Sequence, residues 1–155
     1  MGTKVVAFAA AHRAAVRDLL VEHGWEEPWV EGQLGALDWL SEEPVDGRAF
    51  TALMGVEPAG FVSVRFHHWN RLAQIHGLAV RADLHRRGIA SALVAEAERA
   101  ACEWGARGMY VDTPTTNADG RAFYVSLGYR EAYTMPRYYG DGLDGVTFQR
   151  FFDEL

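Results

Sequence analysis

Cysteine and lysine are almost absent from this sequence, since Cys102 and Lys4 are the only examples in 155 residues. A single cysteine excludes an intramolecular disulfide and fits a reducing compartment. Its place among alanines of a predicted helix favours buried packing over nucleophilic chemistry. No apolar run approaches the ~20 residues that cross a bilayer, and the N-terminus lacks the apolar segment of a secretory signal. We therefore expect a cytoplasmic protein.

The sequence also has fewer basic than acidic residues. The chain carries 15 basic and 21 acidic residues, for a net charge of −6. This balance argues against nucleic-acid binding and favours cationic partners. Many of the acids come early in the chain: Glu22, Glu26, Glu27, Glu31, Asp38, Glu42, Glu43 and Asp46. They are either solvated helix faces or groups that attract an amine.

The hydrophobic pattern predicts one α/β domain over residues 1–155. Predicted strands cover residues 4–8, 50–56, 61–68, 73–80, 109–112, 129–134 and 146–152, and predicted helices cover residues 10–23, 29–40, 88–104 and 118–127. Turns at 57–60 and 69–72 make the three central strands an antiparallel meander. The next strand–helix–strand segment is a β-α-β crossover and predicts a parallel pair. The sum is a mixed sheet flanked by helices.

A basic, glycine-containing turn precedes the helix 88–104. It follows the apolar strand end Leu78, Ala79 and Val80 and comprises His85, Arg86, Arg87, Gly88, Ile89, Ala90 and Ser91. Gly88 permits close backbone approach, and N–H groups at a helix start favour anions. The two arginines add charge-assisted hydrogen bonds. Neither a Walker loop nor a dinucleotide-binding glycine run is present. The segment predicts a phosphate-binding turn, with an ordinary helix start as the alternative.

This turn resembles the acetyl-CoA-binding motif of the GCN5-related N-acetyltransferase (GNAT) family. The family pattern Arg/Gln-x-x-Gly-x-Gly/Ala falls on His85 to Ala90, with His85 departing from it. A second family motif, an Asn followed by Tyr, Gly and an aromatic residue, matches Asn117, Tyr124, Gly128 and Tyr129. The resemblance covers about residues 50–152. It implies the GNAT fold and acetyl-CoA as cosubstrate, with Asn117, Phe123 and Tyr124 joining the turn in binding it.

The resemblance implies direct attack of an amine on the thioester. Tyr124 is the candidate acid for the departing thiolate, because a phenol pKa of ~10 exceeds a thiol pKa of ~8.5. The alternative, aromatic packing, suits Phe123 better. Backbone N–H groups of residues 78–80 would hold the oxyanion, and Gly77 is a candidate bulge that opens the strand. Asn117 either contacts the cosubstrate or simply starts a helix.

His76 is the candidate general base. His76 stands where many relatives carry Glu, and a neutral imidazole with pKa near ~6.5 can accept a proton; an ordinary strand histidine is the alternative. A two-residue turn at Asn70 and Arg71 would pair Arg65 with His76 and His67 with Gln74. A metal site at His67, His68 and His76 is disfavoured because adjacent strand residues face opposite sides and no other ligand completes the set. We expect no metal.

Aromatic and charged residues at two places are candidates for acceptor binding: Trp25, Glu26, Glu27, Trp29 and Glu31, and Tyr133, Arg137, Tyr138 and Tyr139. Aromatics beside carboxylates suit an ammonium group, whereas Arg137 suits a carboxylate.

The sequence therefore predicts an acetyl-CoA-dependent N-acetyltransferase acting on a primary amine of a small molecule or peptide. A non-catalytic acyl-CoA-binding or regulatory module is the alternative, and transfer of another acyl group or to an oxygen acceptor is a third reading. We expect no nucleic-acid or membrane partner, and a homodimer is left open.

Overall fold

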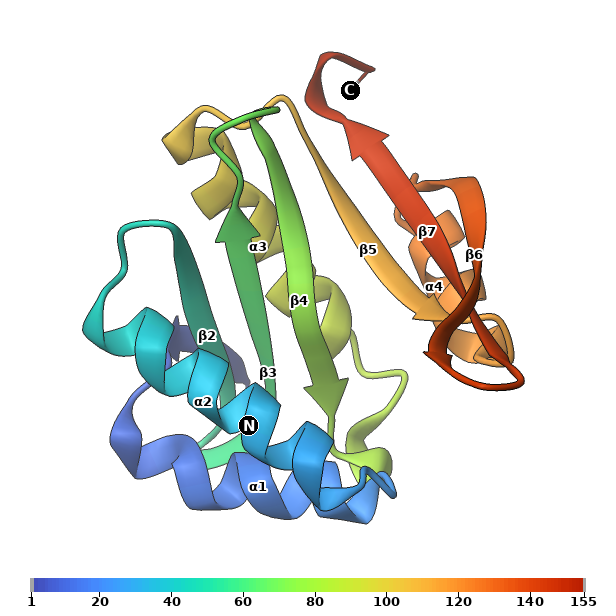
Figure 1. Cartoon of the computed structure of the whole chain (residues 1–155). Coiled ribbons are helices and arrows are strands. Elements are labelled where there is room, and N and C mark those ends of the chain that lie inside the picture. The colour runs from blue at the N-terminus through green and yellow to red at the C-terminus, as the bar shows by residue number, and fades with distance from the viewer. Residues whose placement is uncertain (1, 155) are drawn as a thin grey trace. The chain divides into compact units, whose positions relative to one another are not determined.

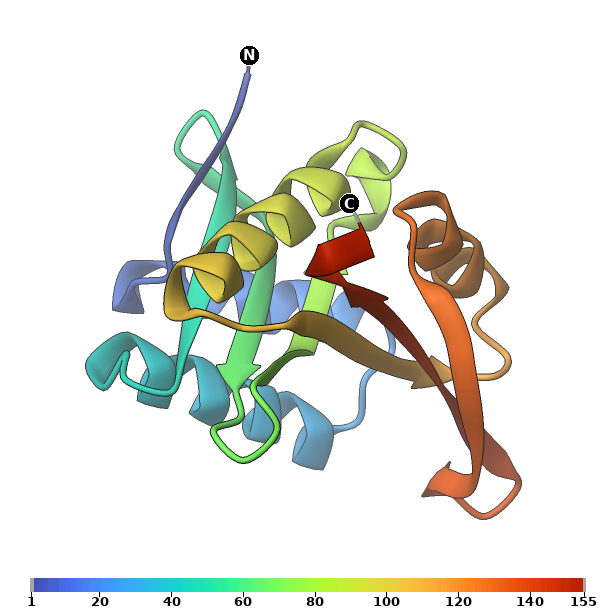
Figure 2. The ribbon, with the colours of Figure 1, turned by 90° about the horizontal axis from the view of Figure 1, so that it is seen from above.

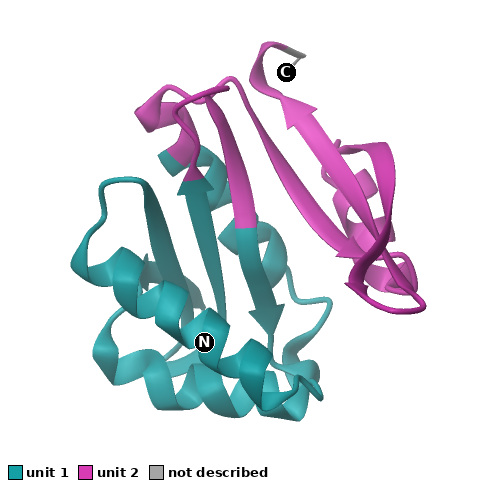
Figure 3. Ribbon diagram, viewed as in Figure 1, with its two compact units in different colours: residues 1–65, 76–100 teal, residues 66–75, 101–155 magenta. Residues whose placement is uncertain are grey.

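The computed structural model describes residues 2–154, which divide into two compact units (Figure 3). Unit 1 comprises residues 1–65 and 76–100, and unit 2 comprises residues 66–75 and 101–155. The single domain over residues 1–155 therefore stays a prediction.

The strands form a seven-stranded mixed sheet in the order β1-β2-β3-β4-β5-β7-β6 (Figure 1). Their bounds are β1 (Thr3–Ala7), β2 (Gly47–Met54), β3 (Glu57–Phe66), β4 (Leu72–Val80), β5 (Gly108–Pro114), β6 (Arg130–Gly140) and β7 (Leu143–Phe151). The α-helices are α1 (Arg13–Glu22), α2 (Glu27–Glu42), α3 (Ile89–Trp104) and α4 (Ala118–Ser126), with short 3-10 turns η1 (Ala10–His12), η2 (Ala82–Leu84) and η3 (Phe152–Glu154). The predicted α/β class and mixed sheet are confirmed.

In unit 1, helices cover both faces of the sheet (Figures 1 and 2). Phe61 of β3 belongs to the core that α1 and α2 form. A Cβ on the neighbouring Gly60 would lie 3.2 Å from Leu93 of α3. Because successive strand residues face opposite sides, two covered faces explain why the run from Ala59 to Val64 is buried without interruption.

Helices α1 and α2 pack through apolar residues at helical spacing: Val16, Leu19 and Leu20, and Val30, Leu34 and Leu37. Burying each such side chain contributes about 1.5–3 kcal/mol. Gly24 ends α1 with a φ of 81°. Its N–H bonds Val21 O at 2.9 Å, and the Trp25 N–H bonds Leu20 O at 3.1 Å. This Schellman motif satisfies the last carbonyls of the helix, which ends at Glu22, one residue before the predicted end at residue 23.

In unit 2, β5 pairs in parallel with the first half of β4, from Leu72 opposite Gly108 to Ile75 opposite Val111. It pairs antiparallel with β7, which forms a hairpin with β6. The parallel pair predicted from the strand–helix–strand pattern is confirmed.

The turn predicted at residues 57–60 is wrong. The chain reverses at Gly55 and Val56, and β3 begins at Glu57. Gly55 adopts a φ of 65°, a conformation that favours glycine, so the turn forms there instead of at Pro58 and Gly60.

The predicted register between the next two strands is also wrong. His67 N–H donates to Leu72 O at 2.9 Å, and Arg71 N–H donates to His67 O at 3.0 Å. His67 therefore lies opposite Leu72 rather than Gln74. The longer turn is stabilised by Asn70, whose Oδ1 accepts from the Leu72 N–H at 3.0 Å.

Cys102 is exposed on α3, contrary to the buried position predicted for it. The buried stripe of the helix passes through Ala97, Ala100 and Ala101 instead. Within residues 2–154, no helix is long and apolar enough to span a membrane. The same residues contain no group of three His, Cys, Asp or Glu side chains placed to hold a metal ion.

Candidate active site

The turn from Arg86 to Gly88 leads into α3 in unit 1. Arg86 and Gly88 have left-handed backbone conformations, with φ of 65° and 80°, whereas Arg87 does not. A backbone that alternates in this way directs successive N–H groups into one anion-binding concavity. The first N–H groups of α3 add to it, because they lack intrahelical acceptors.

The space around this turn suits a phosphate group. A Cβ on Gly88 would meet no atom within 4 Å, and Arg86, Arg87 and Gly88 are all exposed. A left-handed conformation costs a non-glycine residue such as Arg86 roughly 1–2 kcal/mol, and strain of this kind clusters at ligand-binding segments. The first turn of α3 follows, with Ile89 buried, Ala90 half-buried and Ser91 exposed.

The His85 ring turns back toward β4. Its Nε2 lies 3.1 Å from Val80 O, and Nε2 of His23, at the end of α1, lies 2.6 Å from the same oxygen. The two rings stack with their centroids 5.6 Å apart. Because a carbonyl oxygen only accepts, both rings donate from Nε2–H. The His85 side chain thus fixes the path from β4 into the turn.

The two halves of strand β4 have different neighbours. Among the described residues, its pairing with β5 covers Leu72 to Ile75. His76 then lines a pocket with Gln33 of α2, and a Cβ on Gly77 would collide with Gln33 Oε1. Residues 76 and 77 thus both lie beside Gln33, and the bulge at Gly77 stays a prediction. The strand ends with Leu78 and Ala79 half-buried and Val80 buried.

An open pocket of about 480 Å³ is lined by α2, β3 and β4 within unit 1. Its volume lies in the range of small-molecule sites, roughly 300–1,000 Å³. Trp29 and Trp39 supply aromatic surface, and Gln33, Arg65 and His76 supply polar groups. Gln33 Nε2 donates to the His76 carbonyl oxygen at 3.3 Å. Its Oε1 is enclosed and has no hydrogen-bond partner among the described residues.

The His76 ring is half-buried in this pocket. Its Nδ1 is enclosed and lacks a hydrogen-bond partner within residues 2–154. Burial, and then the positive charge of Arg65, lower the pKa of His76 below its ordinary value. The ring is therefore neutral at pH 7 and able to accept a proton.

Tyr124 is buried on α4 in unit 2. Its ring centroid lies 5.2 Å from that of Phe123, 5.9 Å from Tyr129 and 6.0 Å from Phe148. Burial raises the pKa of Tyr124 well above its ordinary value, so the hydroxyl keeps its proton at neutral pH. No hydrogen bond of this hydroxyl falls among the described residues. It can therefore donate to a ligand.

Asn117 makes two side-chain contacts at the start of α4. Its Oδ1 accepts from Gly120 N–H at 3.1 Å, and its Nδ2 donates to Thr113 Oγ1 at 2.9 Å. Of the two roles that the sequence left open, these contacts are those of a helix N-cap. They also tie the start of α4 to the end of β5.

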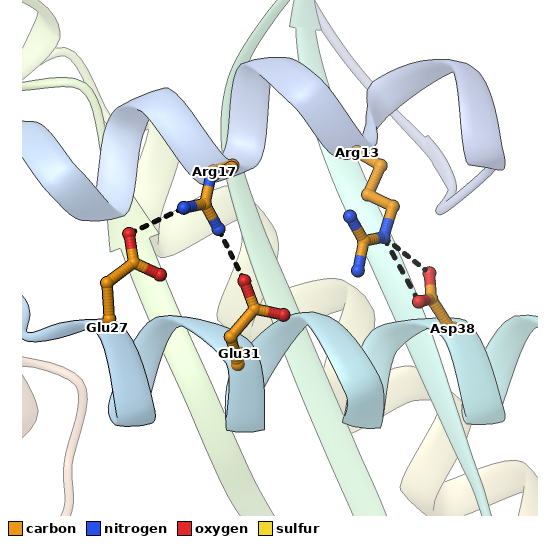
Figure 4. A network of polar contacts seen from close by, with 5 residues as sticks. All are labelled: Arg13, Arg17, Glu27, Glu31 and Asp38. Carbon is orange, nitrogen blue, oxygen red and sulfur yellow. Dashed lines mark hydrogen bonds and ion pairs between the residues drawn. The ribbon is translucent and has the colours of Figure 1, made fainter.

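The acidic acceptor candidates on α2 contact α1. Glu27 and Glu31 form ion pairs with Arg17 at 2.5 and 2.6 Å (Figure 4). Glu26 is the N-cap of α2, and Trp25 packs partly buried against the core of unit 1. Trp29 is the candidate of this group that lines the pocket.

The acceptor candidates on β6 lie in unit 2. Tyr133 and Tyr138 are exposed, and Tyr139 is half-buried. The Tyr138 hydroxyl donates to Asp112 Oδ2 at 3.2 Å. Arg137 N–H donates to Asp144 Oδ1 at 2.9 Å.

Gln33, Trp39 and Arg65 are pocket residues that the sequence did not predict. Gln33 follows Trp29 by one helical turn, so their spacing places both on one face of α2. Arg65 is a charged residue next to a continuously buried stretch of β3, which is unusual without a functional or pairing reason.

The predicted site residues divide between the two units. His76, the strand end and the turn before α3 belong to unit 1, whereas Asn117, Phe123 and Tyr124 belong to unit 2.

Known proteins resemble the chain at the level of sequence. The Acetyltransferase (GNAT) family model matches residues 6–129. The chain is 28% identical over 108 residues, or 66% of its length, to GCN5-related N-acetyltransferase 7, chloroplastic, of Arabidopsis thaliana. It spans 34% of the length of that relative.

Solved structures resemble the chain over nearly its whole length. A protein of Desulfovibrio desulfuricans assigned to the GNAT family has a TM-score of 0.87 and 16% identity, with 97% of this chain and 99% of that chain covered. The PaiA N-acetyltransferase of Thermoplasma acidophilum, in complex with coenzyme A, has a TM-score of 0.77 and 14% identity, with coverage of 98% and 100%. At these identities the two structures establish the fold. The family match extends from β1 through the turn and α4, and the chain therefore belongs to the GNAT family of acetyltransferases.

Proposed function

We propose that this chain transfers the acetyl group of acetyl-CoA directly to a primary amine. The observation that carries the proposal is the left-handed, arginine-bearing turn at Arg86 to Gly88. It follows a strand that stops pairing with β5 after Ile75 and opens a helix whose N-terminus favours phosphate.

The proposed reaction needs a phosphate-binding turn, an oxyanion site, a base and an acid. In unit 1, the turn binds the phosphates, and backbone N–H groups of residues 78–80 stabilise the oxyanion. His76 accepts a proton from the amine, directly or through water, and the amine nitrogen then bonds to the carbonyl carbon. In unit 2, Tyr124 donates its proton to sulfur as the carbon–sulfur bond breaks, and it regains a proton from solvent.

Calorimetry with acetyl-CoA tests the phosphate-binding turn. Each charge-assisted hydrogen bond contributes about 1.5–3 kcal/mol, so we expect the Arg86→Ala, Arg87→Ala double variant to bind at least about tenfold more weakly. The Arg48→Ala, Arg99→Ala variant is a matched control, because it removes the same charge from unit 1 outside the turn. Equal affinity in the wild type and the Arg86, Arg87 variant would contradict this role.

Measuring thiol release in the presence of primary amines distinguishes a transferase from a non-catalytic acyl-CoA-binding module. The proposed transferase releases coenzyme A in proportion to the amine that it acetylates. A binding module on the same fold would bind acetyl-CoA in the calorimeter and release no thiol with any amine.

A further inference from the structure

The pocket on α2 is cationic. Among the described residues that line it, Arg65 is the one lysine or arginine, and none is a carboxylate. No ion pair of Arg65 falls among residues 2–154. Three carboxylates of α2 are instead bonded to arginines of α1 (Figure 4): Glu27 and Glu31 to Arg17, and Asp38 to Arg13. A partly buried guanidinium without a partner favours a ligand with an anionic group, and a carboxylate matches its fork geometry.

Two enclosed acceptor atoms belong to residues that line this pocket. Gln33 Oε1 and His76 Nδ1 have no donor among the described residues. The Gln33 amide is oriented by its Nε2, which donates to the His76 carbonyl oxygen. An enclosed acceptor without a partner costs about 1–3 kcal/mol.

Two tryptophans also line the pocket. Trp29 and Trp39 lie on α2 and are exposed by 51% and 60%. Exposed indole surface beside a pocket favours an apolar or aromatic ligand group. The volume of about 480 Å³ accommodates a molecule with an amine, a carboxylate and a large side chain.

We propose that the acceptor is a free amino acid with an apolar or aromatic side chain. Its amine lies at His76, the proposed base, its carboxylate pairs with Arg65, and its side chain packs on Trp29 and Trp39. This inference rests on the proposed function, since it takes the pocket as the acceptor site. His76 precedes Leu78 by two residues on β4, or about 7 Å along a strand. The amine would therefore lie beside the strand proposed to hold the thioester.

Matched pairs of acceptors test the carboxylate contact. L-phenylalanine and 2-phenylethylamine differ only in the carboxylate, as do L-leucine and 3-methylbutylamine. We expect kcat/KM for thiol release to be at least about tenfold higher for the amino acid of each pair, since a charged hydrogen bond contributes about 1.5–3 kcal/mol. In Arg65→Gln the ratio should fall to near one through a higher KM for the amino acid. In Arg48→Gln, which removes an arginine outside the pocket, the ratio should stay as in the wild type.

The outcomes separate this inference from the proposed function. If acetyl-CoA binds and the decarboxylated amines are acetylated as fast as the amino acids, or faster, the inference is overturned while the transferase function stands. An unchanged ratio in Arg65→Gln also overturns it. If acetyl-CoA does not bind in the calorimeter, or no amine releases thiol, the proposed function fails and the inference fails with it.

Discussion

Tyr124 combines a buried ring with a hydroxyl that has no partner among the described residues. Removing the hydroxyl should therefore change catalysis far more than folding. We expect Tyr124→Phe to lower kcat by about 10²–10⁴-fold, the usual contribution of a general acid, with the melting temperature nearly unchanged. Thiol-release kinetics and thermal unfolding measure the two effects. Full turnover in this variant would show that Tyr124 is not the acid.

The protonation of His76 should determine how the reaction rate changes at acid pH. Its pKa is lowered, by burial first and by Arg65 second, so the neutral form that accepts a proton persists below pH ~6.5. The chemistry-limited rate should be level above that pH and should fall as pH decreases through the lowered pKa. His76→Gln should lose this acid limb together with most of the rate. An acid limb that persists unchanged in the His76→Gln variant would exclude His76 as the base.

At the scale of single residues, the sequence predicted which residue types a turn would contain, but not which residues from distant elements would lie together. Arg86 and Gly88 were predicted from their residue types alone, and both adopt left-handed backbone conformations, while their phosphate-binding role stays a prediction. Gln33 and Arg65 were missed because their significance depends on α2 lying against the ends of β3 and β4, which no local pattern encodes. The same holds for the histidines at Val80 O, where His23 comes from a distant helix.

The close packing around Gly77 of β4 gives a prediction at the scale of an element. A Cβ at Gly77 would collide with the Gln33 amide and lie 3.1 Å from Phe61 Cε2. Gly77→Ala should therefore lower the free energy of unfolding by about 1–3 kcal/mol, as overpacking does. Gly35→Ala is the control, because its Cβ would meet nothing within 4 Å. Alanine within a helix should raise stability there by about 0.5–1 kcal/mol. Denaturant unfolding measures both, and a stabilised Gly77→Ala would contradict the close packing.

Element boundaries were predictable where glycine chemistry sets them. Gly24 and Gly105 end α1 and α3 with φ of 81° and 96°, because glycine adopts this conformation without a steric cost. The turn after β3 was not predictable in the same way. This turn contains Arg71, whose guanidinium lies 4.1 Å from the Trp104 ring centroid, a contact between residues far apart in the sequence.

The stability of the whole molecule should decrease in acid through two histidines. Burial lowers the pKa of both His12 and His76. Below pH ~6.5 the unfolded chain therefore binds more protons than the folded chain, and the free energy of unfolding decreases as pH falls. A His12→Gln, His76→Gln variant should lose less stability between pH 7 and pH 5 than the wild type. The exposed His68→Gln variant is the control, and an equal loss in all three proteins would contradict the assignment.

The pair of rings at Val80 O has a practical consequence for spectroscopy. Both imidazoles donate Nε2–H to one carbonyl oxygen, so both are held in the same tautomer, and one belongs to the segment that opens α3. Nitrogen-15 signals from His23 and His85 should therefore be distinct from those of the other histidines. A nucleotide that binds at Arg86 to Gly88 should shift the His85 signals more than those of the other histidines. Binding could then be followed by NMR of the protein, with an unlabelled ligand.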